Sequence, residues 1–181
     1  MSLEQLIVKC KANDTKAQSE LYKLFSSKLF SLCLKYSRNY AEAEDNLQDA
    51  FVTIFNKIEQ YKNKGSFEGW LKRVTINTAL QRYRNESVFE IINEDMIEDN
   101  TLNIEDNNDI SIDFLLQIIQ ELPDRYRLVF NLYVLDDYAH NDIAEMLNIS
   151  TGTSKSNLAR ARQILKNKII EYKTGHQSQS L

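Results

Sequence analysis

Apolar side chains recur every three or four positions along most of this 181-residue chain, which is the spacing of an amphipathic α-helix. In the first half, the pattern predicts four helices, over residues 3–12, 15–37, 40–63 and 67–85. Asp14 and Ser66 are suitable N-caps for the second and fourth helices, and Gly65 with Asn63 separates the third from the fourth. The single proline, the four glycines and the lack of a convincing strand-rich segment favour an all-α protein.

The clearest local pattern lies near the C-terminus, where residues 142–162 have the layout of a helix-turn-helix. Asn148 suits the left-handed backbone of the tight turn, and Ser150 is a good cap for the helix that follows. The first helix has an apolar face of Ile143, Ala144 and Leu147, and the second has one of Ser154, Leu158, Ala161, Leu165 and Ile169. These faces predict that both helices pack into the core of a small domain.

The polar side of the second helix suits the major groove of DNA, because short residues near its start are followed by longer hydrogen-bond donors. The candidate DNA contacts are Thr153, Lys155, Ser156, Arg160, Arg162 and Gln163. Arg160 and Gln163 could reach base edges, whereas the flanking Lys155 and Arg162 could neutralise phosphates. The alternative is an amphipathic helix whose basic side is only solvated.

The third predicted helix has an acidic side. Its core side holds Leu47, Ala50, Phe51, Ile54, Phe55 and Ile58, and its opposite side holds Glu42, Asp45, Asp49, Val52 and Asn56. Acidic groups around an exposed apolar side chain, here Val52, could dock a basic helical partner. A solvated face is the alternative interpretation.

The fourth predicted helix mixes apolar and cationic groups. Phe67, Trp70, Leu71 and Val74 form a core side, and Arg73, Asn77, Leu80 and Arg84 form a second stripe. The loop before it places Lys62 and Lys64 beside Tyr61, a combination that could bind unstacked bases. Core packing is the alternative for Tyr61 and the expected role of Trp70.

Charge is strongly segregated along the chain, although its net value is only −4. Lys and Arg outnumber Asp and Glu by 14 to 9 in residues 1–84 and by 8 to 5 in residues 125–181, whereas residues 85–124 hold 12 acids and no base. We therefore expect two small helical domains, residues 1–86 and 111–175, joined by a flexible acidic linker, residues 87–110, and followed by a tail, residues 176–181.

Few residues suggest chemistry. Cys10 and Cys33 both lie in helical apolar patterns, so buried free thiols are expected rather than a disulfide or a metal site. His140 and His176 have no neighbouring nucleophile or ligand cluster, and we expect neither a cofactor nor catalysis. A signal peptide and a membrane span are not expected, which favours a soluble cytoplasmic protein.

Three blocks carry a resemblance that covers the whole chain: Ala43–Phe51 (AEDNLQDAF), Gly65–Leu71 (GSFEGWL) continuing to Asn77-Thr78-Ala79, and Leu122–Arg127 (LPDRYR) leading into the helix-turn-helix. In this order and spacing they resemble the bacterial RNA polymerase sigma-70 family, in its extracytoplasmic-function group (group IV). The helix-turn-helix by itself is shared with many regulators.

The resemblance implies partners for each block. The first block is similar to the helix that binds the clamp coiled coil of core RNA polymerase, which implies contacts by Asp45, Gln48, Asp49 and Val52. The third resembles the domain that reads the minus-thirty-five promoter element as duplex DNA, which implies the recognition-helix set given above. The polymerase flap and an inhibitory anti-sigma factor are further implied partners, and the linker would run through the polymerase.

The second block resembles the element that reads melted minus-ten DNA, where a base leaves the stack and enters a pocket. Asn77 matches the family's pocket residue, and Tyr61 lies in its specificity loop. The implied minus-ten contacts are Tyr61, Lys62, Lys64, Arg73, Asn77 and Arg84.

The chain departs from the family pattern at three positions of the helix-turn-helix. Asn157 stands where arginine is common, so one DNA contact could be missing. Ser154 replaces the usual valine on the buried side, and Asn148 replaces the usual glycine of the turn. The main alternative function is a stand-alone regulator, in which the N-terminal helices dimerise or bind a ligand and the operator is palindromic.

Overall fold

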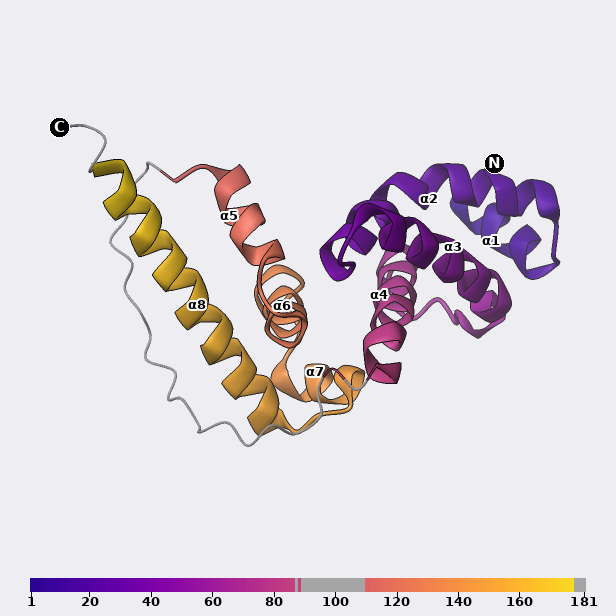
Figure 1. Ribbon diagram of the computed structural model, residues 1–181. Helices are drawn as coiled ribbons and strands as arrows, with labels where there is room; N and C mark the ends of the chain where they lie inside the picture. The colour runs from indigo at the N-terminus through magenta and orange to yellow at the C-terminus, as the bar shows by residue number, and fades with distance from the viewer. Residues whose placement is uncertain (87, 89–109, 178–181) are drawn as a thin grey trace. The chain divides into compact units, whose positions relative to one another are not determined.

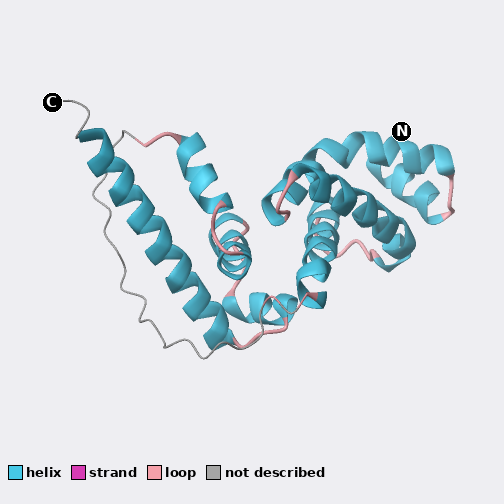
Figure 2. Ribbon diagram, in the orientation of Figure 1, coloured by secondary structure: helices cyan, strands magenta, loops and turns pink. Residues whose placement is uncertain are grey.

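The computed structural model describes residues 1–86, 88 and 110–177, and every regular element among them is a helix (Figure 1; Figure 2). The chain divides into two compact units, Met1–Glu86 and Ser87–Leu181. Each unit has its own apolar core. Because the regular elements of the described residues are all helical, the predicted all-α class is confirmed. The predicted linker, apart from Val88 and Ile110, and residues 178–181 of the predicted tail lie outside the described residues.

The first unit consists of α1 (Leu3–Lys11), α2 (Thr15–Tyr36), α3 (Tyr40–Lys57), the 3₁₀ turn η1 (Ile58–Gln60) and α4 (Phe67–Asn85). Both predicted caps are confirmed, because Asp14 accepts hydrogen bonds from the amides of Lys16 and Ala17, and Ser66 accepts one from Gly69. The break between α3 and α4 is confirmed by left-handed backbones at Asn63 (φ 56°) and Gly65 (φ 82°).

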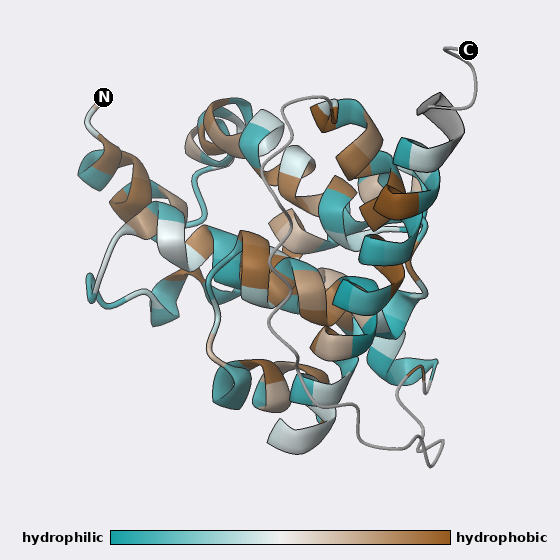
Figure 3. Ribbon diagram, turned by 90° about the vertical axis from the view of Figure 1, so that its left-hand side faces the viewer, coloured by the Kyte–Doolittle hydropathy of each residue, from teal (hydrophilic) through white to brown (hydrophobic). Residues whose placement is uncertain are grey.

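The core of this unit forms where α2, α3 and α4 pack against one another and α1 covers α2. Apolar and polar stretches alternate along the helices of the chain, as the brown and teal bands of Figure 3 show, which is the pattern of helices with one apolar side. Cys10 and Cys33 are buried in this core as free thiols, as expected. Burial raises the pKa of the Cys33 thiol to about 12, so this group is not an available thiolate at neutral pH.

Three details of the first unit differ from the sequence prediction. The third helix ends at Lys57 and continues only as a 3₁₀ turn to Gln60, because the Tyr61 amide donates to the Ile58 carbonyl and turns the chain inward. Leu80, which was expected on the stripe with Arg73, is fully buried because α4 packs on both α2 and α3.

The third difference concerns Glu42, which the sequence places on the acidic side of the third helix. Its side chain is buried, at 6% exposure, and is not part of an open acidic face. One of its carboxylate oxygens accepts a 2.8 Å hydrogen bond from the Arg38 amide, and the other lies 3.6 Å from Arg82 Nε. The cation and the amide compensate for the burial of the carboxylate. Glu42 therefore ties α3 to α4 and is not a docking group.

The second unit consists of α5 (Ile112–Gln120), α6 (Asp124–Phe130), the π-helical turn η2 (Asn131–Leu135), α7 (His140–Leu147) and α8 (Thr151–Gln177). The long α8 packs against α5, α6 and α7, and α7 lies beside its N-terminal end (Figure 1). The helix-turn-helix is confirmed: Asn148 has φ 55° and ψ 49°, and Ser150 Oγ accepts a 2.9 Å hydrogen bond from the Thr153 amide. These two residues set the angle at which α8 leaves α7.

Candidate functional site

The faces of α8 are as the sequence predicts. Its apolar side is buried and holds Ser154, Leu158, Ala161, Leu165 and Ile169. Opposite to it, Gln163 is exposed and Thr153, Ser156 and Arg160 are partly exposed, while the flanking Lys155 is exposed and the flanking Arg162 is partly exposed. The six candidate DNA contacts therefore all reach the surface of one helix, in the half nearest to the turn.

Two of the departures in the helix-turn-helix have structural explanations. Ser154 is completely buried, and its Oγ lies 2.9 Å from His140 Nδ1, so the hydroxyl has a hydrogen-bond partner. The His140 ring also stacks on Tyr133, with ring centroids 4.4 Å apart. Asn157 is buried too, at 6% exposure, so it faces the interior of the unit rather than a groove of DNA.

Replacing Ser154 by alanine should remove the bond to His140 and lower the free energy of unfolding of the second unit by about 1 kcal/mol. Urea denaturation checks this value. Ser156→Ala is the matched control, because the Ser156 hydroxyl donates to Thr153 O of its own helix and should contribute much less. Equal stabilities of the two variants would contradict a structural role for the Ser154–His140 pair.

The acidic side of α3 is open at the predicted docking residues. Asp45, Gln48 and Asp49 are exposed, and Val52 is 60% exposed. Gln48 and Asp49 follow Asp45 by three and four residues, and Val52 follows them by four and three, so the four residues lie along one face of the helix. This face combines two carboxylates, an amide and an apolar side chain.

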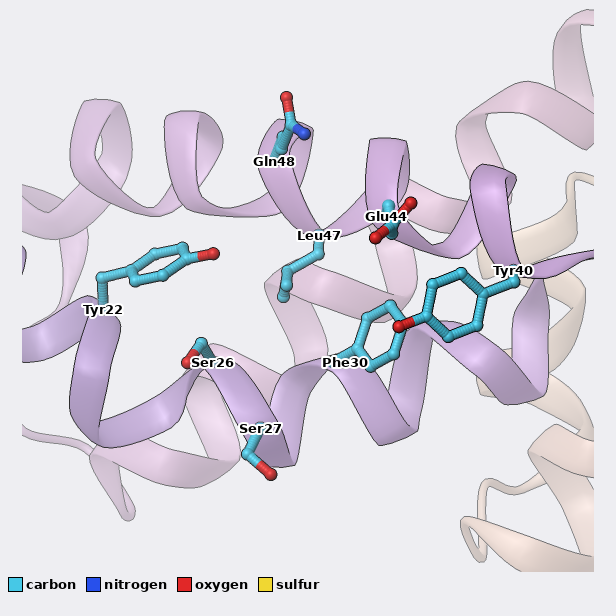
Figure 4. Close-up of a pocket in the computed structure, with 8 residues that line it drawn as sticks. All are labelled: Tyr22, Ser26, Ser27, Phe30, Tyr40, Glu44, Leu47 and Gln48. Carbon is cyan, nitrogen blue, oxygen red and sulfur yellow. The ribbon is translucent and has the colours of Figure 1, made fainter.

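A groove of about 400 Å³ lies between α2 and α3, next to this acidic face. Its lining combines aromatic, hydroxyl, acidic, aliphatic and amide groups: Tyr22, Ser26, Ser27, Phe30, Tyr40, Glu44, Leu47 and Gln48. The Phe30 and Tyr40 rings meet edge to face at one end, with centroids 5.1 Å apart, while Tyr22 stands near the other end (Figure 4). Gln48 belongs to both the groove and the acidic face, so the two form one continuous surface.

The predicted cationic groups in the loop before α4 and in its first half lie on the surface. Lys62, Lys64 and Arg73 are exposed. The nearby Glu68 carboxylate is already paired with Lys28 at 3.2 Å and Lys72 at 3.3 Å. The hydrogen bond from Lys28, helped by one from Lys72, holds the pKa of Glu68 below its usual range.

Asn77 and Arg84 lie farther along α4 and are partly buried. Arg84 Nη2 donates a 3.0 Å hydrogen bond to the Asn77 carbonyl, so the guanidinium folds back along the helix towards Asn77. The structure therefore brings these two predicted residues together and leaves the Asn77 amide side chain partly accessible.

Tyr61 does not lie open to the solvent, as base stacking would require. It is only 7% exposed, and its ring packs on Phe67 and Trp70 at centroid distances of 5.0 and 5.7 Å. Its hydroxyl donates to the Gly65 carbonyl at 2.9 Å. The stacking interpretation of Tyr61 is thus corrected in favour of core packing, which its aromatic neighbours make more favourable.

Tyr61→Phe should keep the ring in place and lose only the bond to Gly65, which lowers the free energy of unfolding of the first unit by about 1 kcal/mol. Tyr40→Phe serves as the control because Tyr40 is 62% exposed. Chemical denaturation of both variants measures the difference. An unchanged free energy of unfolding in Tyr61→Phe would mean that this hydroxyl does not stabilise the loop.

Two family models match this chain, one in each unit. The model described as Sigma-70 region 2 matches residues 21–88, and the model described as Sigma-70, region 4 matches residues 115–165. The chain belongs to the sigma-70 family.

Relatives place this sigma-70 member in the extracytoplasmic-function (ECF) group. It is 27% identical to the ECF RNA polymerase sigma factor SigW of Bacillus subtilis, over 93% of this chain and 97% of that protein. It is 26% identical to the ECF RNA polymerase sigma-E factor of Haemophilus influenzae, over 92% of this chain and 94% of the other.

Solved structures share the fold of this sigma-70 member. One is the sigma factor RpoE in complex with the anti-sigma factor NepR from Bartonella quintana, with a TM-score of 0.52, 21% identity and coverage of 82% of this chain and 94% of that one. Another is CnrH in complex with the cytosolic domain of CnrY, with a TM-score of 0.51, 17% identity and coverage of 92% and 96%. At these identities the likeness concerns the fold.

Sequence reasoning missed the residues of this sigma-70 member that act through long-range contacts. Lys11 at the end of α1 reaches the carbonyl of Tyr61, and Asn46 donates to Ser37 at 2.9 Å inside the turn before α3. Neither pair has a local spacing signal, because the partners lie fifty residues apart in the first pair and nine in the second. A polar residue on an otherwise apolar side, such as Asn46, is the one available sign of such a contact.

Proposed function

We propose that this chain is a dissociable specificity subunit of RNA polymerase, which binds core polymerase, directs it to promoters and helps to open the DNA. The observation that carries this proposal is the presence, in one chain, of an open acidic face on α3 and a polar recognition face on α8, each within the part of the chain that a sigma-70 model matches. A cytoplasmic location follows from the partner proposed.

Core polymerase would dock on the α3 surface. Asp45 and Asp49 would attract a basic helix such as the clamp coiled coil, and Val52 would make a desolvated contact. The groove beside them extends the surface to α2 and offers room for a side chain between Phe30 and Tyr22. A second contact, with the polymerase flap, is assigned to the unit that contains α8.

Promoter DNA would bind at two places. The recognition face of α8 would read the minus-thirty-five element as duplex, with Arg160 and Gln163 towards base edges and Lys155 and Arg162 towards phosphates. The melted minus-ten strand would bind to the side chains of Lys62, Lys64, Arg73 and Asn77. Arg84 would hold the main chain at Asn77 through its hydrogen bond to the Asn77 carbonyl. Capture of a flipped base must offset an unstacking cost of a few kcal/mol.

Regulation by an anti-sigma factor is part of the proposal, since the two solved neighbours above were determined in complex with partner proteins and the RpoE partner is an anti-sigma factor. No membrane insertion is proposed: within residues 1–86 and 110–177 no helix is both long and apolar enough to span a bilayer. The proposal involves neither a cofactor nor a bond-making step by this chain.

Binding measurements test this division of labour. Residues 1–86 are only modestly basic, with 14 Lys and Arg against 10 Asp and Glu, and residues 111–175 hold eight of each, so the free chain should bind duplex DNA weakly and without specificity at physiological salt. Labelled chain titrated with core polymerase should instead show tight binding, and the complex should then retain specific DNA. A tight, sequence-specific DNA complex formed by the free chain would contradict the proposal, as would the absence of any complex with core polymerase.

A further inference from the structure

The loop between η1 and α4 is anchored by a residue from the other end of the first unit. Lys11, the last residue of α1, donates a 2.8 Å hydrogen bond from Nζ to the main-chain carbonyl of Tyr61. We propose that Lys11 is a positioning residue for promoter reading, because its ammonium sets the conformation of loop residues 62–65. This inference rests on the proposed role of that loop at the minus-ten element.

The loop needs such support because its backbone is unusual. Asn63 and Gly65 both have positive φ, and for a non-glycine residue such as Asn63 the left-handed region is less favourable. Without surrounding contacts, a four-residue stretch of this kind would sample other conformations. Contacts at its start therefore decide which conformation is populated.

Two hydrogen bonds converge on Tyr61 at the start of the loop. Its hydroxyl donates to the Gly65 carbonyl and closes the loop from within, whereas Lys11 holds its carbonyl from outside. The bond from Lys11 has a charged donor and is partly buried, so it should be stronger than a neutral bond at the surface. Lys11 thus ties the main chain at the start of this loop to α1.

The side chains of the loop remain available to a ligand. Lys62, Asn63 and Lys64 are exposed, and in the described chain none of the three makes a side-chain hydrogen bond or ion pair. A fixed backbone with free polar side chains is a preorganised binding surface, which loses less conformational entropy when DNA binds. Lys11 would contribute to recognition without touching the DNA.

Removal of the ammonium should spare the fold. Helix α1 is attached to the core through Leu6, Ile7 and Cys10, all of them buried. Lys11→Met keeps a long aliphatic side chain and removes only the charged donor. Lys9→Met is the matched control, because Lys9 lies on the same helix, is exposed and carries the same charge.

Hydrogen exchange of the free, full-length protein tests the contact itself. In Lys11→Met, peptides covering Tyr61, whose amide donates to the Ile58 carbonyl, should exchange about fivefold faster than in the wild type, while α2 and α3 keep their protection. Lys9→Met should exchange like the wild type, and Lys11→Arg should restore most of the protection. Unchanged exchange in Lys11→Met would overturn the inference.

Promoter selection tests the consequence. Polymerase reconstituted with each variant is allowed to transcribe a library that is randomised only in the minus-ten element, and the bases of the transcribed templates are counted. Lys11→Met should lower the preference for the favoured base by about fivefold, with unchanged minus-thirty-five preference and unchanged affinity for core polymerase. Lys11→Arg should recover most of the preference, and Lys9→Met should retain all of it.

The outcomes separate this inference from the proposed function. If the wild-type protein supports no initiation at all, the proposed function fails, whatever the exchange data show about Lys11. If the wild type initiates and Lys11→Met keeps the same minus-ten preference, the inference about Lys11 is wrong. A parallel loss of core binding, minus-thirty-five preference and thermal stability would also overturn it, since that pattern indicates a general structural role.

Discussion

Asp49→Arg should strongly weaken the association of this chain with core RNA polymerase. Asp49 is exposed on α3, on the same face as Asp45 and Val52. Arginine at this position would face the basic helix proposed as partner, and a like-charge contact of this kind costs about 2–4 kcal/mol, or about thirtyfold to a thousandfold in affinity. Titration of labelled protein with core polymerase measures the change.

The control for this variant is Glu20→Arg, which makes the same change of charge on α2. Glu20 is exposed on α2 and does not belong to the acidic face of α3. It should bind core polymerase like the wild type. Normal assembly of Asp49→Arg, or an equal loss in Glu20→Arg, would contradict the docking surface proposed here.

Arg160→Ala should reduce recognition of the minus-thirty-five element by about 1–3 kcal/mol, because a bidentate contact from a guanidinium to a base edge is worth about that much. Arg160 is partly exposed on the recognition side of α8, nine residues after the helix begins at Thr151. Transcription by the reconstituted polymerase from templates that differ only in this element measures the loss.

Two further variants distinguish a base contact from a general loss of charge. Lys155→Ala removes a cation proposed to contact phosphates. It should therefore weaken binding to all templates alike and make that binding less dependent on salt concentration. Lys173→Ala removes the same charge about 27 Å farther along α8 than Lys155 and should change little. If Arg160→Ala weakens all templates uniformly, or changes none, Arg160 does not read bases.

The local geometry of this protein could be read from its sequence because it depends on neighbouring residues. The caps at Asp14, Ser66 and Ser150 and the left-handed turn at Asn148 follow from backbone and side-chain preferences within four residues. The buried side of α8 follows in the same way, since helical spacing alone selects it.

The burial of polar and aromatic groups could not be read in this way. Tyr61 looks like a loop residue among lysines, and only the approach of Phe67 and Trp70 makes the core its favoured place. Glu42 belongs to the polar side of α3 by spacing, but the Arg38 amide and the Arg82 guanidinium compensate for its burial. Both outcomes depend on tertiary contacts that no local window contains.

The same limit applies to the candidate sites. Spacing placed Arg160, Gln163 and Asp49 on open helix faces, where the structure also has them. It did not indicate the groove between α2 and α3, which arises from the packing of two helices, or the contact from Lys11 to the loop. Candidate binding residues on exposed helix faces therefore follow from spacing, whereas contacts made only in the folded chain do not.

Transcription in vitro by core RNA polymerase on genomic fragments, with and without this protein, tests the central claim most directly. Mapping of the transcript starts should reveal new starts that depend on the protein and share two upstream elements at a constant spacing. A protein that binds no core polymerase, produces no new start and protects a palindromic site as a dimer would contradict the account and identify a stand-alone regulator.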